Sequence, residues 1–227
     1  MNIGIFGTGM VGQALAAKLT SLGHRVVIGT RNVDATLAKT TPDGFGNPPI
    51  NVWLAQYPTV KLAPFSDAAL HGEVLINATS GKSSMEVLRL VGEAGMNGKI
   101  LIDISNPLDF SKGMPPSLTV CNTDSLGEQI QRAFPAVKVV KTLNTMNAVL
   151  MVNPNLVAGG DHHVFVSGND PDAKSIVAGF LKSWFGWKNI IDMGDITTAR
   201  GTEMLLPVWV RLWGTLKTPM FNFKIAQ

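Results

Sequence analysis

The feature that most constrains the fold of this chain is a glycine-rich turn near its N-terminus, which matches the pattern G-x-G-x-x-G. The residues of the turn are Gly7, Thr8, Gly9, Met10, Val11 and Gly12. A β-branched and apolar run, Asn2 to Phe6, precedes the turn, and apolar residues at helical spacing follow it from Met10 to Leu22. A second strand is expected at Arg25 to Ile28. A chain that opens in this way is predicted to form a βαβ unit.

Each glycine of the turn has a physical role in dinucleotide binding. Gly7 permits the tight turn, Gly9 lets the backbone approach a pyrophosphate because no Cβ is in the way, and Gly12 lets the helix pack closely on the strand. The free amides of the first helical turn, with the positive end of the helix dipole, then hold the two phosphates. The alternative is an ordinary glycine-rich turn, but the flanking strand and helix favour a dinucleotide site formed by all six residues.

The end of the second predicted strand indicates which dinucleotide binds. A protein specific for NAD places an acidic side chain here, which accepts hydrogen bonds from the ribose 2′-hydroxyl. This chain has Thr30, Arg31 and Asn32 instead. A hydroxyl beside a guanidinium can hydrogen-bond a 2′-phosphate, which a carboxylate would repel, so we expect NADP(H) as the cofactor. An alternative stays open, in which Arg31 pairs with Asp34.

The rest of the chain alternates strands with helices, which is typical of a parallel sheet with right-handed crossovers. Further strands are expected at Val60 to Leu62, Val74 to Asn77, Ile100 to Ile104, Val137 to Thr142, Val164 to Val166 and Ile190 to Asp192. Further helices are expected at Met85 to Gly92, Leu126 to Phe134 and Pro171 to Phe185, with a surface loop at Pro42 to Pro49. The predicted fold class is α/β, a Rossmann doubly wound and mostly parallel sheet.

A small helical appendage is expected to follow the sheet. Residues 1–193 would form the NADP-binding Rossmann domain, and residues 194–227 a C-terminal helical segment. This segment is predicted to be interrupted at Pro207, because proline removes an amide and clashes with the preceding turn. We expect it to close a pocket for a second substrate around Met204, Leu206 and Pro207.

The C-terminal segment also carries more apolar side chains than one helical stripe can bury. These side chains are Leu205, Leu206, Val208, Trp209, Val210, Leu212, Trp213 and Leu216. Trp209 and Trp213 are four positions apart, so they share one face of a helix. We therefore expect a homodimer with two-fold symmetry that packs through this segment. The alternative is that the segment covers only the sheet of its own chain.

Three polar loops follow predicted strands, where ligands collect in a doubly wound sheet. They are Asn77-Ala78-Thr79-Ser80-Gly81, Asp103-Ile104-Ser105-Asn106-Pro107 and Thr142-Leu143-Asn144-Thr145-Met146-Asn147. The first two loops are predicted to bind the cofactor, through Ala78, Thr79, Ser80, Asn106 and Pro107. The third is predicted to supply the catalytic residues, Asn144 and Thr145. The alternative for each loop is that its polar residues serve as turn and helix-cap residues.

Composition excludes several other classes of protein. Of the 227 residues, 45% are apolar and 15% charged, so the chain is too apolar to be disordered. The formal charge is only +3 and there is no block of like charges, so nucleic acid is not an expected partner. The lone Cys121 cannot form an intrachain disulfide, and the chain starts with a strand, so a cytoplasmic location is expected. The apolar stretch Met204 to Leu216 contains Arg211 and falls short of the roughly 20 residues that span a bilayer.

No acid–base pair stands out in the sequence. The four histidines, His24, His71, His162 and His163, lack further ligands at metal spacing, so we expect them to be structural or solvated and expect no metal site. Lys141, near the end of its strand, is the one basic candidate, although strand alternation could equally point it away from the site. A hydride transfer to a redox-active acceptor needs little from the protein beyond positioning.

The sequence resembles the NADPH-dependent coenzyme F420 oxidoreductase family, a Rossmann group that moves hydride between NADP and a deazaflavin. The resemblance covers most of the chain and is carried by the glycine-rich turn and by the stretch Gly29-Thr30-Arg31-Asn32. It implies that the 2′-phosphate contacts fall on Thr30 and Arg31. Two loops, Asp103 to Pro107 and Leu143 to Thr145, are more similar to the oxidoreductase domain of the six-transmembrane metalloreductases. The sequence departs from F420 enzymes at Asn144-Thr145-Met146-Asn147, where they have a His-Thr pair followed two residues later by proline.

These observations lead to three functional hypotheses. The first is an NADPH-dependent oxidoreductase with a small-molecule redox acceptor, and coenzyme F420 is the named acceptor. The second is an NADPH-dependent reductase of a flavin, a quinone or a ferric chelate, suggested by the metalloreductase-like loops. The third is a non-catalytic NADP(H) sensor, suggested by the missing catalytic base.

Overall fold

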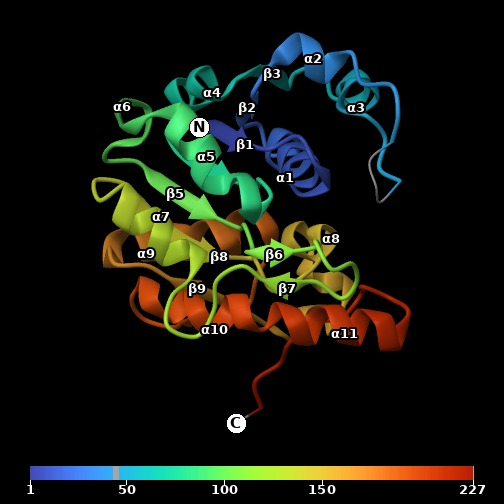
Figure 1. The fold of residues 1–227 in the computed structure, drawn as a ribbon, viewed down its shortest axis with the longest axis vertical. Helices are drawn as coiled ribbons and strands as arrows, with labels where there is room; N and C mark the ends of the chain where they lie inside the picture. The colour runs from blue at the N-terminus through green and yellow to red at the C-terminus, as the bar shows by residue number, and fades with distance from the viewer. Residues whose placement is uncertain (43–45, 227) are drawn as a thin grey trace.

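A twisted eight-stranded sheet forms the centre of the computed structural model, which describes residues 1–42 and 46–226 (Figure 1). The strand order is β10-β9-β8-β5-β4-β1-β2-β3. The strands are β1 (Asn2–Phe6), β2 (Arg25–Thr30), β3 (Lys61–Pro64), β4 (Val74–Asn77), β5 (Ile100–Asp103), β8 (Lys138–Thr142), β9 (His163–Ser167) and β10 (Asn189–Asp192). All neighbouring strands pair in parallel except β8 and β9. The mostly parallel α/β sheet is therefore confirmed, and β9 and β10 run opposite to the other six strands.

Helices cover both faces of the sheet. The longer elements are α1 (Met10–Ser21), α5 (Gly81–Val91), α7 (Leu126–Ala133), α9 (Pro171–Phe180) and α11 (Leu206–Leu216). The shorter helices are α2 (Val33–Leu37), α3 (Ile50–Gln56), α4 (Phe65–His71), α6 (Glu93–Met96), α8 (Ala148–Val152) and α10 (Ala199–Met204). Single helical turns are η1 (Pro154–Leu156), η2 (Ala158–Gly160), η3 (Leu181–Phe185) and η4 (Ile196–Thr198), and a small hairpin is formed by β6 (Leu108–Asp109) and β7 (Ser117–Leu118).

Alternating side chains on each strand fill two separate cores, because successive residues of a strand point to opposite faces. On β4, Val74 and Ile76 pack in the core shared with α1, α3, α8 and α9. Leu75, between them, packs in the core shared with α4, α5, α7 and α10. Both faces of the sheet are therefore buried, as expected for a doubly wound fold.

The structure refines three predicted segments. The helix expected from Pro171 to Phe185 is α9 followed by the wider turn η3. The C-terminal helix does break before Pro207, which lies in the first turn of α11, where a missing amide costs nothing. The loop expected at Pro42 to Pro49 has no regular structure at 46–49, while residues 43–45 lie outside the described residues.

The C-terminal helices α10 and α11 follow one another along the lower part of the molecule in Figure 1. α10 packs on α7, and Met114 and Pro115, from the connection of the hairpin, share a hollow with Val210 and Arg211 of α11. Within the part of the chain that the structure describes, no helix is long and apolar enough to cross a membrane. The C-terminal segment packs beside the carboxyl ends of β5 and β8, where the predicted site lies.

Candidate functional site

The glycine-rich turn has the geometry that a dinucleotide requires. Gly7 has φ +120°, a conformation that side chains rarely adopt, and a Cβ there would meet the carbonyl oxygen of Ala78 at 2.5 Å. A Cβ on Gly12 would meet the carbonyl oxygen of Gly7 at 2.1 Å, so only glycine lets α1 approach β1 this closely. A Cβ on Gly9, by contrast, would point into open space. Glycine at position 9 is therefore not needed to avoid a clash within the protein. Its missing side chain leaves space for a ligand above the turn.

The N-terminus of α1 opens onto this space and carries no side-chain cap. Its first turn contains no acidic residue, and Gly9 itself is the N-cap. Unpaired amides and the positive end of the helix dipole attract phosphate. The open space at Gly9 and this uncapped helix fit the pyrophosphate of NADP(H).

A cavity of about 400 Å³ extends from the turn to the carboxyl ends of β4, β5 and β8. We call it the cleft. Its lining residues are Gly9, Met10, Val11, Asn47, Ala78, Thr79, Ser80, Gly81, Ile104, Ser105, Asn106, Leu108, Phe110, Asn144, Met146, Met151, Leu206 and Trp209. No charged side chain is in this set, which covers only the described residues. The cleft therefore suits an uncharged, flat ring system on apolar walls.

The polar side of the cleft is held by a reciprocal pair of amides. Asn106 Nδ2 donates to Asn144 O at 2.8 Å, and Asn144 Nδ2 donates to Asn106 Oδ1 at 3.0 Å. The two residues come from the loops after β5 and β8. Each amide fixes the other, so both loops present a single rigid polar surface to the cleft.

Part of the apolar lining of the cleft comes from α11. Leu206 and Trp209 line it, and the Trp209 ring stacks on Phe221 with 5.3 Å between ring centroids. Trp209 is only 9% exposed, and its buried Nε1 has no hydrogen-bond partner among the described residues. The C-terminal segment thus supplies a wall of the cleft through Leu206, whereas the expected residues Met204 and Pro207 are not among its lining residues.

Other predicted residues lie beside the cleft without lining it. Thr145 is buried and Pro107 lies beneath α5, where a Cβ on Gly81 would meet Pro107 N at 2.9 Å. Thr8 lines a neighbouring hollow of about 370 Å³ together with Lys39. Leu108, Phe110 and Met151 line the cleft but were missed by sequence reasoning. The hairpin that carries Leu108 is too short to show strand alternation, so the sequence contains no signal for it.

The end of β2 has three interactions that the sequence did not predict. The Thr30 hydroxyl is buried and hydrogen-bonded to the Thr36 hydroxyl at 2.7 Å, and Asn32 Oδ1 caps α2 by accepting from Ala35 N at 2.8 Å. Arg31 does not pair with Asp34, as the alternative proposed, but with Glu86 of α5, with 2.9 Å between Nη2 and Oε1. The reason is that Asp34 belongs to the first turn of α2, whereas the long Arg31 side chain reaches across to α5.

Lys141 does not line the cleft and lies in a buried ionic cluster. It is 1% exposed and lies between the carboxylates of Asp103 (2.9 Å) and Glu203 (2.8 Å). Burial disfavours the charged ammonium, but the two carboxylates outweigh burial and raise the pKa of Lys141 above its ordinary value. Lys141 is therefore a charged structural group and not a general base.

The histidines hold parts of the chain together. His71 Nε2 lies 3.0 Å from Arg25 O, and His162 Nε2 lies 2.9 Å from Pro154 O. His163 Nδ1 accepts from Ile225 N in the C-terminal tail, at 3.2 Å. The His24 ring packs on Trp184, with 5.0 Å between the ring centroids. None of them lines the cleft.

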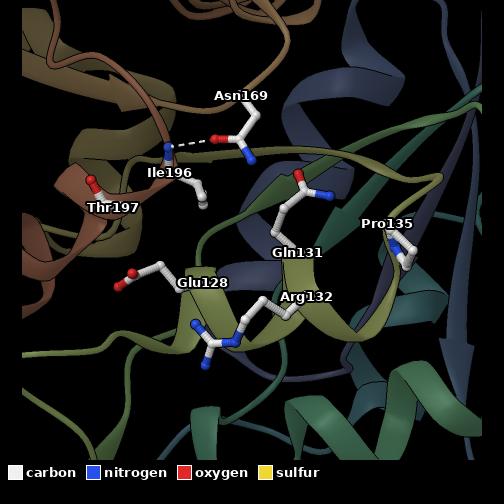
Figure 2. Close-up of a pocket in the computed structure, with 7 residues that line it drawn as sticks. All are labelled: Glu128, Gln131, Arg132, Pro135, Asn169, Ile196 and Thr197. Carbon is white, nitrogen blue, oxygen red and sulfur yellow. Dashed lines mark hydrogen bonds between the residues drawn. The ribbon is translucent and has the colours of Figure 1, made fainter.

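A separate hollow, of about 370 Å³, lies between α7 and η4 (Figure 2). Its lining residues are Glu128, Gln131, Arg132, Pro135, Asn169, Ile196 and Thr197. Polar groups there bind one another: Asn169 Oδ1 accepts from Ile196 N at 3.0 Å, and Glu128 pairs with Arg200. It contains no predicted site residue, so we place the functional site at the cleft.

A Rossmann sheet with an open phosphate-binding turn and a cleft at its strand ends is the architecture of a dinucleotide-binding protein. The family described as NADP oxidoreductase, coenzyme F420-dependent, matches residues 2–107. The crystal structure of a candidate F420-dependent NADP reductase from Arthrobacter sp. FB24 is 60% identical, covers 100% of both chains and has a TM-score of 0.96. The chain belongs to the coenzyme F420-dependent NADP oxidoreductase family.

Two more distant relatives are similar over nearly the whole chain. The F420-dependent NADP reductase of Methanothermobacter marburgensis is 25% identical over 216 residues, which are 93% of this chain and 92% of the relative. The metalloreductase STEAP3 of Rattus norvegicus is 27% identical over 214 residues, 92% of this chain. The chain spans only 38% of the length of that metalloreductase. Both resemblances noted from the sequence are therefore confirmed.

Proposed function

We propose that this protein transfers a hydride between NADP(H) and a flat redox-active acceptor in the cleft, and that coenzyme F420 is this acceptor. The observation that carries the proposal is the continuity of the cleft with the phosphate-binding turn. The cleft starts at Gly9 and ends at the apolar wall formed by Leu206 and Trp209. A dinucleotide anchored at the turn would extend its nicotinamide between the polar loops and this wall.

The residues have distinct roles in this proposal. The turn, Gly7 to Gly12, holds the pyrophosphate through backbone amides, and Arg31 binds the 2′-phosphate. Thr79 and Ser80 contact the nicotinamide ribose, and Asn106 binds the carboxamide. Asn144 contacts the nicotinamide and holds Asn106 in place through its side-chain amide.

When bound, NADPH supplies the hydride, so the protein itself needs no acid–base chemistry at the reacting carbon. The apolar wall excludes water from the nicotinamide, and the paired amides orient it. Holding two reactants in a near-attack geometry lowers the activation barrier of such a reaction by a large amount. The absence of a charged group from the described lining of the cleft is consistent with this role.

A second candidate acceptor is a flavin or a ferric chelate, which the similarity to the metalloreductase favours. Asn144 stands where F420 enzymes carry the histidine of a His-Thr pair, and the loops that hold Asn106 and Asn144 resemble those of the metalloreductases. We further propose that the protein is cytoplasmic, that residues 1–193 form the NADP-binding domain, and that residues 194–227 form both the acceptor wall and a homodimer contact.

Oxidation of NADPH by the purified protein tests the proposal, with coenzyme F420, FMN, a quinone and a ferric chelate offered separately. We expect F420 to give the highest kcat/KM. A preference for FMN or the ferric chelate would support the second candidate. Tight NADPH binding without turnover of any of the four would indicate a sensor and contradict the proposal.

A further inference from the structure

Lys141 joins three parts of the chain beneath the cleft. Its Nζ lies 2.9 Å from Asp103 Oδ2 at the end of β5, and 2.8 Å from Glu203 Oε1 on α10. The same ammonium also donates to Ser105 O, in the loop that carries Asn106. An ammonium has three donor hydrogens, so all of them are used within the protein. Lys141 therefore acts on the surrounding chain and not on a substrate.

On one side, the cluster holds the polar loops of the cleft. Asp103 Oδ1 accepts from Asn77 Nδ2 at 2.8 Å and from Ser105 Oγ at 2.7 Å. Asn77 Oδ1 in turn accepts from Thr79 Oγ1 at 2.6 Å. Both Thr79 and Ser105 line the cleft. One buried carboxylate thus connects the loops that follow β4 and β5.

On the other side, the cluster holds the apolar wall. The Glu203 carboxylate accepts from Leu126 N at 2.8 Å and from Gly127 N at 3.0 Å, at the start of α7. These amides and the positive end of the helix dipole compensate the second negative charge of the cluster. Glu203 lies one turn before Leu206, the first wall residue of α11. The bonds of its carboxylate therefore hold the chain close to the point where the wall begins.

Stability alone does not account for such a cluster. Lys141, Asp103 and Glu203 are each at most 1% exposed, so their charges have lost their hydration. Replacing a buried ion pair with well-packed apolar residues is often neutral or stabilising. What the ionic cluster provides is fixed geometry, because each bond has a defined length and direction. The cluster connects the polar loops that line the cleft with α10, the helix that precedes the α11 wall.

We propose that Lys141 is a positioning residue which, through Glu203, fixes the spacing between the Asn106 loop and the wall formed by Leu206 and Trp209. The bound nicotinamide is then held rigidly between the two. This inference rests on the proposed function, since it concerns the same cleft. It adds residues that do not line the cleft and that none of the functional hypotheses included.

The test uses Glu203→Gln, which removes the charge and keeps the volume. Calorimetry measures the Kd for NADPH, and the emission of bound NADPH reports how rigidly the nicotinamide is held. We expect the gain in emission on binding to fall at least two-fold, with the Kd within two-fold of the wild type, because the pyrophosphate turn is untouched. If Glu203→Gln shows the same gain in emission as the wild type, the proposal is overturned.

Arg200→Met is the matched control. Arg200 also lies on α10 and pairs with Glu128 of α7, with 2.6 Å between Nη2 and Oε1, but it touches neither Lys141 nor the cleft. The Arg200→Met variant therefore removes an ion pair between α10 and α7, the same two helices that Glu203 connects. We expect it to lose stability while keeping the wild-type gain in emission. If both variants lose the gain equally, loosening of α10 in general explains the effect, and the specific role of Lys141 is wrong.

If Glu203→Gln does not fold, amide hydrogen exchange of the wild-type protein tests the positioning role of the cluster instead. NADPH should slow exchange at Leu126 and Gly127, which do not line the cleft, by at least three-fold, and leave α9 unchanged. Slowing confined to the residues that line the cleft would contradict the proposal. Failure of the wild type to bind NADPH at all would instead contradict the proposed function.

Discussion

Arg31 at the end of β2 and Glu86 on α5 form an ion pair, with 2.9 Å between Nη2 and Oε1 and about 60% of each side chain exposed. The pair joins the end of β2, where we propose that the 2′-phosphate binds, to the helix that follows the polar loop after β4. Among the described residues only Nη2 of the guanidinium has a hydrogen-bond partner, so the other nitrogens can donate to a phosphate. Glu86 is thus in a position to compete with a 2′-phosphate for Arg31.

Arg31→Ala should weaken NADPH binding roughly 10- to 150-fold and leave NADH binding almost unchanged, since a charge-assisted contact is worth about 1.5–3 kcal/mol. Glu86→Gln should strengthen NADPH binding up to about five-fold, the value of a surface ion pair. Calorimetric titration measures both effects. In the Arg31→Ala background the Glu86 effect should vanish. If Arg31→Ala leaves the preference for NADPH intact, the phosphate is recognised elsewhere.

Gly9→Val should abolish NADPH binding without unfolding the protein. Gly9 has φ −78° and ψ −177°, which valine adopts easily, and its Cβ would enter the space kept for the pyrophosphate. Its melting temperature should stay within about 2 °C of the wild type but should no longer rise when NADPH is added. Gly12→Ala is the contrasting variant, because its Cβ clashes with Gly7 O, and it should cost about 1–3 kcal/mol of stability. Persistent stabilisation of Gly9→Val by NADPH would refute the assignment of the turn.

These glycines could be predicted because their requirement is local, whereas several other features of the site depend on distant partners. The partner of Arg31 is 55 positions away in the sequence, so a nearby acid such as Asp34 was the natural alternative. Lys141 sits on a strand buried on both faces, where alternation cannot decide which way a side chain points. Only the packing of α10, which brings Glu203 beside it, determines its role.

The homodimer prediction is best tested at apolar side chains that the structure leaves exposed on α11. Trp209 is 9% exposed and packs on Phe221, so a charge there would damage the fold itself. Val208 and Leu216 are 48% and 51% exposed on the same helix. Val208→Glu with Leu216→Glu should therefore convert a dimer into a monomer in light scattering. A wild-type mass near 24 kDa at micromolar concentration would end the dimer proposal.

The start of α7 should make the protein sensitive to acid. Hydrogen bonds from Arg132, at 2.9 and 2.8 Å, lower the pKa of Asp124 from 3.8 to about 2. Because the folded pKa lies below the unfolded value, this carboxylate contributes stability that is fully present above about pH 4 and is lost as the pH falls towards 2. Arg132→Met should flatten the decline in the free energy of unfolding between these pH values. An identical decline in both proteins would show that the pair contributes nothing.

A single turnover with NADPH deuterated at the nicotinamide C4 shows whether the hydride passes directly from the cofactor to the acceptor. A hydride accepted by a deazaflavin becomes a C–H bond that does not exchange with water. With coenzyme F420 as the acceptor, we predict that reduced F420 carries the deuterium when one face of the nicotinamide is labelled and not when the other is. Reduced F420 without deuterium from either label, or no reduction of F420 by bound NADPH, would contradict direct hydride transfer to F420.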